Sequence, residues 1–423
     1  MKILVIGSGG REHAICWKLR QSVHCTELFC APGNAGIAEI ATCLVADMND
    51  AAKLAELAGS IAADLTLVGP EMPLVAGVAE TFAARGLRIV APSQAAAQLE
   101  GSKIFAKKFM ERHQIPTARY TICDSPDQAI SARYSDYPFP CVVKADGLAS
   151  GKGVRLIYEQ SDFEFAINAM MLDRVLGDAG EVVILEEFLK GREASLMVFT
   201  DGRDYKIIAP AQDYKRIYDG DRGPNTGGMG SFSINGLIED AMLEQIKGEI
   251  IEPTLEGMRA EGYAFRGILY FGLMLTADGP KVIEYNARFG DPETQAVMMR
   301  LDSDLVEICE AILESQIGKT EIKWSDEPSV CLVASSGGYP AEFRKGRVIT
   351  GLAEANAVEG VTVFHAGTAH DKQGNIATSG GRVLGVTARA ATLDEARKRV
   401  YEAMGKIQFT KMYYRKDIAK HSA

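Results

Sequence analysis

Residues 1 to about 100 alternate short apolar runs with stretches of helical character. Helical stretches begin at Glu12 and extend from Ala76 to Arg85, and the apolar runs between and around them lie at 3–6, 65–68 and 89–90. Alternation of strand and helix is typical of a parallel sheet covered by helices. The pattern predicts an α/β, Rossmann-like domain over residues 1–102.

The alternation of apolar runs and helical stretches changes near residue 100. Gly101-Ser102-Lys103 opens a predicted helix that runs to about His113, and from residue 141 apolar runs follow one another closely. Close spacing of strands favours an antiparallel α+β unit. We predict a central domain over 103–325 with a small antiparallel lid at about 121–190, and a C-terminal α+β domain over 326–423. The last helix has strong end signals, with Thr392 and Glu395 as a capping box and Gly405 as the stop.

Composition narrows the class of protein. The 423 residues carry 46 basic and 56 acidic side chains, a net charge of −10, so no overall positive field attracts nucleic acid or an anionic membrane. No apolar stretch reaches membrane-spanning length, and the eight cysteines form no CxxC pair. We expect a cytoplasmic enzyme with reduced thiols, small-molecule partners and no nucleic-acid or membrane partner.

A glycine turn follows the first apolar run, as Gly7-Ser8-Gly9-Gly10-Arg11-Glu12. A dinucleotide fold binds phosphate at this position, through backbone N–H groups and a helix N-terminus. The GxGxxG fingerprint fails because Glu12 stands where the third glycine belongs, which argues against a nicotinamide cofactor. Phosphate binding by Gly9, Gly10 and Arg11 and a purely structural tight turn remain equally open.

A second glycine-rich segment runs from Lys144 to Gly153 between two predicted strands. It has three residues between its glycines where a Walker A loop has four, and a strand follows it instead of a helix. We interpret it as a flap that closes over a polyphosphate, with Lys144 beneath it and Gly151, Lys152 and Gly153 on it. A hairpin loop with solvated lysines is the alternative.

Two further stretches place polar groups at strand ends. Glu186-Glu187-Phe188-Leu189 follows an apolar strand, and such a segment can pair with an adenine edge, although acidic residues there are often only solvated. In the stretch 281–295, Glu284 and Asn286 are two apart and share a strand face. A carboxylate beside an amide oxygen suits Mg²⁺, and Arg288 can reach the same side. The glycine-rich stretch 219–236 predicts a long ordered loop with a function.

Taken in order, these segments resemble the ATP-grasp superfamily and, within it, the glycinamide ribonucleotide synthetases (phosphoribosylamine–glycine ligases). The resemblance runs nearly end to end. Its two most specific motifs are Gly223-Pro224-Asn225-Thr226-Gly227-Gly228-Met229-Gly230 and Arg288-Phe289-Gly290-Asp291-Pro292-Glu293, and it also rests on segments 7–14, 31–36, 68–71, 99–103 and 144–148.

The resemblance implies an ATP-dependent ligase that joins glycine to 5-phosphoribosylamine through a glycyl phosphate, in purine biosynthesis. ATP is the co-substrate, Mg²⁺ or Mn²⁺ the metal, and the enzyme a monomer or weak homodimer. The metal ligands implied by the resemblance are Glu284 and Asn286. The preceding strand 270–274 offers no carboxylate where many ATP-grasp enzymes have a metal-binding acid, which leaves open how a second metal ion is held. The implied ATP-binding residues are Lys103, Lys144, Gly151, Lys152, Gly153, Glu186, Glu187, Phe188, Leu189 and Glu193.

The reaction suggests roles for the other residues. Phosphoryl transfer needs alignment and charge neutralisation, so we assign Lys144 and Arg288 as catalytic, with Arg288 on the transferring phosphoryl or a later oxyanion. The predicted substrate-binding residues are Gly9, Gly10, Arg11, Asp213, Lys215, Gly228, Arg288, Asp291 and Pro292. A ligase for another carboxylate and amine, and a non-catalytic nucleotide-binding protein, are the two rival hypotheses.

Overall fold

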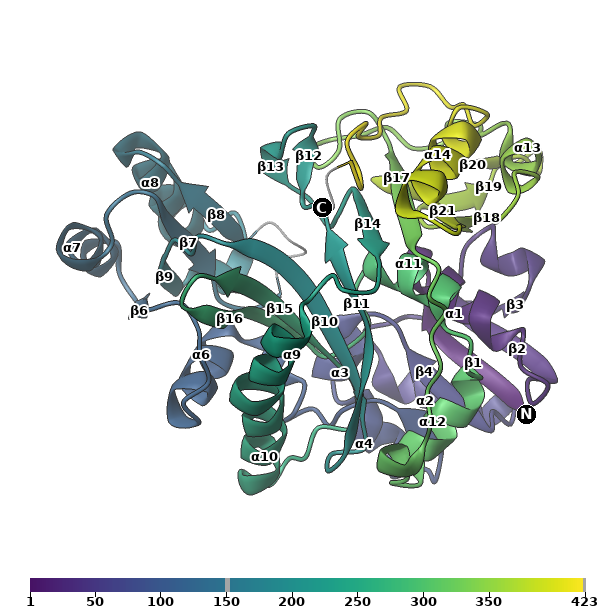
Figure 1. Cartoon of the computed structure of the whole chain (residues 1–423), viewed down its shortest axis with the longest axis horizontal. Helices are drawn as coiled ribbons and strands as arrows, with labels where there is room; N and C mark the ends of the chain where they lie inside the picture. Colours follow the sequence, from purple (N-terminus) through teal and green to yellow (C-terminus); the bar gives the residue numbers. More distant parts are fainter. Residues whose placement is uncertain (149–152, 421–423) are drawn as a thin grey trace.

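The N-terminal part folds around a five-stranded parallel sheet (Figure 1). The protein is described here from a computed structural model covering residues 1–148 and 153–420. The strand order β3-β2-β1-β4-β5 confirms the predicted Rossmann-like sheet. The strands are β1 (Lys2–Gly7), β2 (Glu27–Pro32), β3 (Thr42–Cys43), β4 (Leu65–Val68) and β5 (Ile89–Val90), and the main helices around them are α1 (Gly10–Leu19) and α2 (Ala51–Ser60).

The single helix expected over 76–85 is wrong in detail. The chain instead forms α3 (Glu71–Val75) and α4 (Val78–Ala83), separated by Gly77 in the left-handed conformation with φ +80°. Glycine adopts that conformation without the Cβ penalty and so ends one helix before the next begins. The next predicted helix is confirmed as α6 (Lys103–Arg112), with the Ser102 hydroxyl accepting from the Phe105 N–H.

The lid is a separate four-stranded antiparallel sheet with its own apolar core (Figure 1). Its strand order is β6-β9-β7-β8, and the ladders between neighbours are all antiparallel. The lid elements are β6 (Tyr120–Cys123), α7 (Pro126–Asp136), β7 (Cys141–Ala145), β8 (Val154–Ile157), α8 (Gln160–Ile167) and β9 (Val183–Glu187). The predicted antiparallel lid is confirmed.

An eight-stranded antiparallel sheet joins the central and C-terminal parts, in the order β16-β15-β10-β11-β14-β17-β21-β18. The junction is the ladder between β14 and β17, where Phe232 pairs with Val330. The C-terminal α+β unit therefore extends a sheet that the central domain begins. The strands are β10 (Arg192–Thr200), β11 (Tyr205–Asp213), β14 (Gly230–Ser233), β15 (Gly267–Thr276), β16 (Gly279–Asn286), β17 (Ser329–Ser335), β18 (Val361–His365) and β21 (Arg382–Arg389).

The glycine-rich stretch 219–236 is not the long loop that its composition predicts. It contains β13 (Arg222–Asn225), which pairs with β12 (Arg216–Tyr218), and it contains β14 of the large sheet. The β14 backbone pairs with β11 on one side and with β17 on the other, although the side chains of the stretch show no strand pattern. Tertiary pairing has overridden local propensity.

Helices cover the remaining sheet faces. The capped terminal helix is confirmed as α14 (Leu393–Met404), with the Thr392 hydroxyl accepting from the Glu395 N–H at 3.2 Å and Gly405 at its C-cap. Further helices are α9 (Asp240–Ile246), α10 (Glu252–Ala260), α11 (Glu293–Arg300) and α12 (Leu305–Leu313), with the short α5 (Gln98–Gly101) and α13 (Leu352–Asn356). Among the described residues, no helix has the length and apolar character that a membrane span requires.

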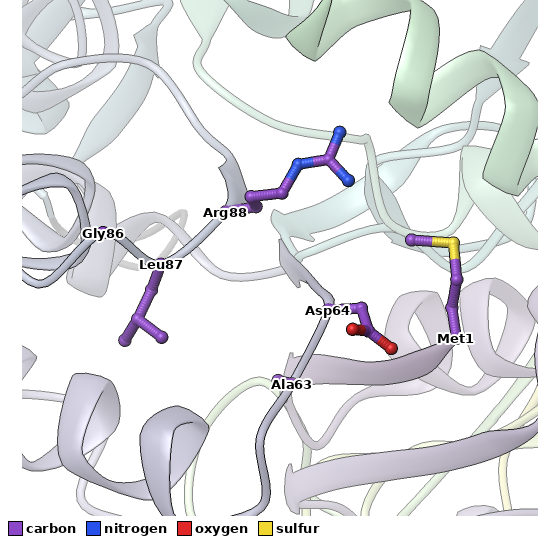
Figure 2. Close-up of a pocket in the computed structure, with 6 residues that line it drawn as sticks. All are labelled: Met1, Ala63, Asp64, Gly86, Leu87 and Arg88. Atoms are coloured by element: carbon purple, nitrogen blue, oxygen red, sulfur yellow. The ribbon is translucent and has the colours of Figure 1, made fainter.

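The two edges of the parallel sheet differ. At the amino ends of its strands a small hollow is bordered by Met1, Asp64 and Arg88 (Figure 2). At the carboxyl ends, Arg11 and Glu71 line a much larger cleft. Ligands of open parallel sheets bind beyond the carboxyl ends of the strands, so the second edge is the one to examine for a site.

Candidate active site

The large cleft has a volume of about 1240 Å³ and is bordered by the parallel sheet, the lid and the eight-stranded sheet. It collects most of the residues predicted from the sequence. Those that line it are Arg11, Lys103, Lys144, Gly153, Glu186, Glu187, Phe188, Leu189, Glu193, Asp213, Lys215, Glu284, Asn286, Arg288 and Asp291. Gly9, Gly10, Gly228 and Pro292 are not part of this lining, and Gly151 and Lys152 lie outside the described residues.

Glu284 lies on β16 opposite Gly272 of β15. A Cβ at Gly272 would come within 3.0 Å of the Glu284 Cγ, so the absence of a side chain there makes room for the carboxylate. Lys215 Nζ lies 3.2 Å from Glu284 Oε1. Lys215, helped by Lys144 and Lys103, outweighs burial and lowers the pKa of Glu284 to about 2. Glu284 is therefore an ionised carboxylate facing the cleft.

Arg288 follows the end of β16 and is held by two carboxylates from the N-terminal part of the chain. Its Nη2 lies 2.7 Å from Glu100 Oε1, and its Nε lies 3.4 Å from Glu71 Oε2. Burial alone would lower the pKa of Arg288, but Glu100 and Glu71 raise it. Its Nη2 also donates to Asn286 Oδ1 at 3.3 Å, whereas its buried Nε donates no hydrogen bond within the described residues. Arg288 is thus a fixed cation at the wall of the cleft.

Two lysines hold one buried carboxylate at the base of the lid. Lys144 Nζ lies 2.9 Å from Glu186 Oε2, and Lys107 Nζ lies 3.2 Å from Glu186 Oε1. Lys107 also donates to Thr117 and to the Ala118 carbonyl. Burial lowers the pKa of Lys107 to about 8, against the opposing effect of Glu186. The strand end carrying Glu186 is therefore fixed against both the lid strand β7 and helix α6.

The other predicted nucleotide-binding residues line the cleft with the trio of Lys107, Lys144 and Glu186. Lys103 Nζ donates to the Gly147 carbonyl at 2.9 Å, at the root of the predicted flap. Burial lowers the pKa of Lys103, partly opposed by Glu284. Glu187 accepts from the Arg119 N–H at 2.9 Å and from Lys281 at 3.3 Å. Phe188 and Leu189 add apolar surface to the wall of the cleft, as a flat base would require.

Acidic groups gather near Lys215, on the side away from the lid. Burial raises the pKa of Asp213 to about 8, although Lys215 opposes it. Glu293 accepts from Ser195 at 2.9 Å and from Tyr270 at 3.0 Å. Glu193 lies 3.9 Å from Lys215. This region can hold an ammonium and an alcohol, and can take or give a proton near neutral pH.

The first glycine turn has an internal partner. The Gly9 N–H donates to the Glu12 carboxylate, and Arg11 Nε donates to the same carboxylate at 2.6 Å. Arg11 Nη1 also donates to the Phe289 carbonyl at 3.1 Å. The turn thus positions Arg11 at the cleft and ties it to the 288–293 segment, which accords with the structural reading of this turn.

The glycine-rich stretch and the Asp291-Pro292 turn pack directly on each other. Gly228 has φ +111°, and a Cβ there would lie 2.3 Å from Pro292 Cδ, so only glycine fits. The Ser231 hydroxyl donates to the Pro292 carbonyl at 2.8 Å. Gly228 and Pro292 therefore shape the wall from behind, while Asp291 faces the cleft.

Several lining residues are absent from the sequence-based prediction. Lys107 follows Lys103 by one helical turn, so its i, i+4 spacing was a usable signal. Glu71 and Glu100 lie in segments used for the resemblance, but without a role. Tyr339 and Arg382 reach the cleft from the C-terminal domain, and no local pattern marks them.

The donor set suits a hard divalent cation. Glu284 is ionised at neutral pH, and Asn286 offers an amide oxygen two residues on along the same strand. Carboxylate and amide oxygens with room for phosphate oxygens and water are typical of Mg²⁺. The residues present thus fit one metal ion that arrives with a polyphosphate.

Family models match nearly the whole chain. The phosphoribosylglycinamide synthetase N domain matches residues 1–100, the ATP-grasp (A) domain matches 101–294, and the C domain matches 329–421.

Individual relatives agree with the family models. The phosphoribosylamine–glycine ligase of Caldanaerobacter subterraneus is 46% identical over 419 residues, covering 99% of each chain. That of Pseudomonas aeruginosa is 48% identical over 421 residues, covering 99% of this chain and 97% of its own. The crystal structure of the Thermotoga maritima phosphoribosylamine–glycine ligase superposes with a TM-score of 0.85 at 34% identity, covering 99% of this chain and 100% of that one. The chain belongs to the phosphoribosylglycinamide synthetase family.

Proposed function

We propose that the cleft joins the carboxyl group of glycine to the amine of 5-phosphoribosylamine with hydrolysis of ATP to ADP and phosphate. The chain is a phosphoribosylamine–glycine ligase of the ATP-grasp type, acting in purine biosynthesis. The single observation that carries the assignment of roles is the grouping of Lys144, Glu284 and Arg288 in one cleft. This grouping supplies what phosphoryl transfer to a carboxylate requires.

The nucleotide is assigned to the lid side of the cleft. There Lys103 and Lys144 offer ammonium groups to the phosphates, and the strand end 186–189 offers backbone groups to adenine. The trio of Lys107, Glu186 and Lys144 holds this region rigid before the nucleotide arrives. A pre-organised site loses less entropy on binding.

Glu284 and Asn286 would hold the Mg²⁺ or Mn²⁺ that accompanies ATP, and this ion would neutralise charge on the phosphate oxygens. Around it the protein groups align the reactants. Arg288, fixed by Glu71 and Glu100, offers its guanidinium to the transferring phosphoryl group or to the oxyanion that follows.

The reaction balances without a nucleophilic side chain. A glycine carboxylate oxygen attacks the γ-phosphorus and ADP leaves, so that an acyl phosphate forms. The phosphoribosylamine nitrogen then attacks the acyl carbon, and phosphate leaves with that glycine oxygen. The attacking amine loses one proton. We assign the ionised form of Asp213, whose pKa burial raises to about 8, to receive that proton.

Oxygen labelling tests this mechanism. Glycine carrying ¹⁸O in both carboxyl oxygens is incubated with ATP, Mg²⁺ and phosphoribosylamine generated in situ. The proposal predicts one ¹⁸O in each phosphate released and one in the amide product. Unlabelled phosphate would exclude a glycyl phosphate, and product formed with another amine at equal efficiency would favour a different ligase.

A further inference from the structure

The C-terminal domain reaches the cleft through two side chains. Arg382 is the first residue of β21, and Tyr339 lies four residues beyond the end of β17. Both line the cleft near Asp291. Neither is needed to join the two halves of the large sheet, since the β14–β17 ladder already does so.

Arg382 links two segments of the central domain. Its Nη1 donates to the carbonyl oxygens of Gly227 and of Asp291, the latter at 2.8 Å, and its Nη2 lies 2.9 Å from Asp291 Oδ2. A planar guanidinium can make these contacts together because its N–H groups point in fixed, diverging directions. One side chain thus fastens the 225–230 segment to the 291–292 turn.

Tyr339 contacts the same residue, Gly227, through the backbone N–H of that residue. The Gly227 N–H donates to the Tyr339 hydroxyl at 3.0 Å. Both polar groups of Gly227 are therefore bonded to the C-terminal domain. The neighbouring Gly228 already packs against Pro292, so the segment has little freedom left.

The charges on this contact are sheltered. Burial alone would raise the pKa of Asp291, but Arg382 and Arg11 outweigh it and lower the pKa. The side chains of Asp291 and Arg382 are only 17% and 21% exposed, so solvent screens the pair less than a surface pair. Without Arg382, Asp291 would keep the hydrogen bond from Gln295 Nε2 to its Oδ1 at 2.8 Å but lose the contact that fixes its Oδ2.

We propose that Arg382 and Tyr339 are positioning residues for the ligation step, holding the 225–230 segment and the Asp291 turn where glycine and phosphoribosylamine bind. The inference rests on the proposed function. It gives the C-terminal domain a direct part in substrate binding, separate from the nucleotide side, because neither side chain bonds to Lys103, Lys144 or Glu186 within the described residues.

The test compares Arg382→Ala, Arg382→Lys and Tyr339→Phe with a matched control at the other end of the same strand. Arg389 is that control, because its Nε pairs with Glu327 at 2.9 Å and its side chain lies away from the cleft lining. The Michaelis constants for glycine, phosphoribosylamine and ATP are measured, together with MgADP affinity by calorimetry.

We expect Arg382→Ala to raise the Michaelis constant of glycine or of phosphoribosylamine about tenfold or more, with MgADP affinity unchanged. Arg382→Lys should not restore the wild-type Michaelis constant, since a single ammonium group cannot make the diverging hydrogen bonds of the guanidinium. Tyr339→Phe should change the same constant in the same direction by less, and Arg389→Ala should match the wild type.

Equal Michaelis constants in Arg382→Ala and Arg389→Ala would overturn the inference. So would a parallel loss of MgADP affinity, which a general structural role predicts. If Arg382→Ala fails to fold, Tyr339→Phe decides, because it removes a single hydroxyl. Wild-type protein that is inactive with glycine and phosphoribosylamine would instead overturn the proposed function.

Discussion

Lys215 Nζ lies 3.2 Å from Glu284 Oε1, so the carboxylate best placed to bind a metal already faces a fixed ammonium. Glu284, and Asp213 when it is ionised, raise the pKa of Lys215 against the effect of burial. Lys215 therefore stands between the metal side and the substrate side of the cleft. Substitutions at Lys215 and Glu284 should therefore have opposite effects on the binding of a divalent cation.

Replacing Lys215 with Met should strengthen binding of a divalent cation and weaken the use of substrate. The substitution removes a positive charge beside Glu284, and a nearby cation opposes the arrival of another. Mn²⁺ affinity in the presence of ADP, followed by electron paramagnetic resonance, is expected to rise while kcat/KM for glycine falls. Weaker Mn²⁺ binding in Lys215→Met would contradict this arrangement.

Replacing Glu284 with Gln should have the opposite effect on the metal. The amide keeps the shape of the side chain but loses its charge, so Mn²⁺ affinity and ADP formation should both fall, the latter about 100-fold. The fold should stay intact by circular dichroism, because Gln can still contact Lys215. A fully active Glu284→Gln enzyme would refute Glu284 as a metal ligand.

Replacing Lys107 with Met should weaken nucleotide binding. Among the described residues, it leaves the buried Glu186 carboxylate with Lys144 as its one lysine partner, and breaking a buried pair costs about 3 kcal/mol. The Michaelis constant for ATP should rise while that for glycine stays constant. The neighbouring Lys108 is exposed and provides the matched control. Equal Michaelis constants for ATP in Lys107→Met and Lys108→Met would show that Lys107 does not support nucleotide binding.

Stability should fall as the pH drops below 6.5. The backbone N–H of His365 donates to His13 Nδ1 at 2.8 Å across the contact between the N- and C-terminal parts, so His13 must be neutral. Burial lowers the pKa of His13 to about 3, helped by His365, and that of His365 to about 4, helped by His370.

Between pH 6.5 and about 4 the unfolded chain therefore binds protons that the folded chain does not. Each histidine then reduces the free energy of unfolding by up to about 1.4 kcal/mol per pH unit. Urea unfolding at pH 7, 6 and 5 measures this slope. In His13→Gln the slope should be shallower, and a slope equal to that of the wild type would rule out His13 as its source.

Local patterns predicted the parts of the fold that local patterns control. The apolar runs that became β1 and β4 and the capping signals at Thr392 and Gly405 all identified their elements. The helix break at Gly77 was not predicted because it depends on the left-handed conformation of one glycine. The strand β14 was not predicted because it depends on pairing with β17, where Phe232 lies opposite Val330. Helical period and strand alternation carry neither kind of information.

The site divides in the same way. The presence of Glu284 and Asn286 in the cleft could be predicted because strand periodicity places both on one face, and that of Lys144 because it precedes a glycine-rich segment. The roles of Glu71 and Glu100 in fixing Arg288 depend on how the N-terminal sheet packs against β16, as those of Tyr339 and Arg382 depend on the C-terminal domain. These contacts join residues far apart in the chain, so no motif could show them.

Release of ADP from MgATP, measured with glycine and in situ phosphoribosylamine separately and together, tests the assignment of the reaction. We expect rapid ADP formation only when both co-substrates are present, with loss of that rate in Glu284→Gln. ADP released with neither co-substrate, or only with a different amine, would contradict the assignment of the reaction. No ADP from folded protein that binds ATP would contradict its assignment as an enzyme.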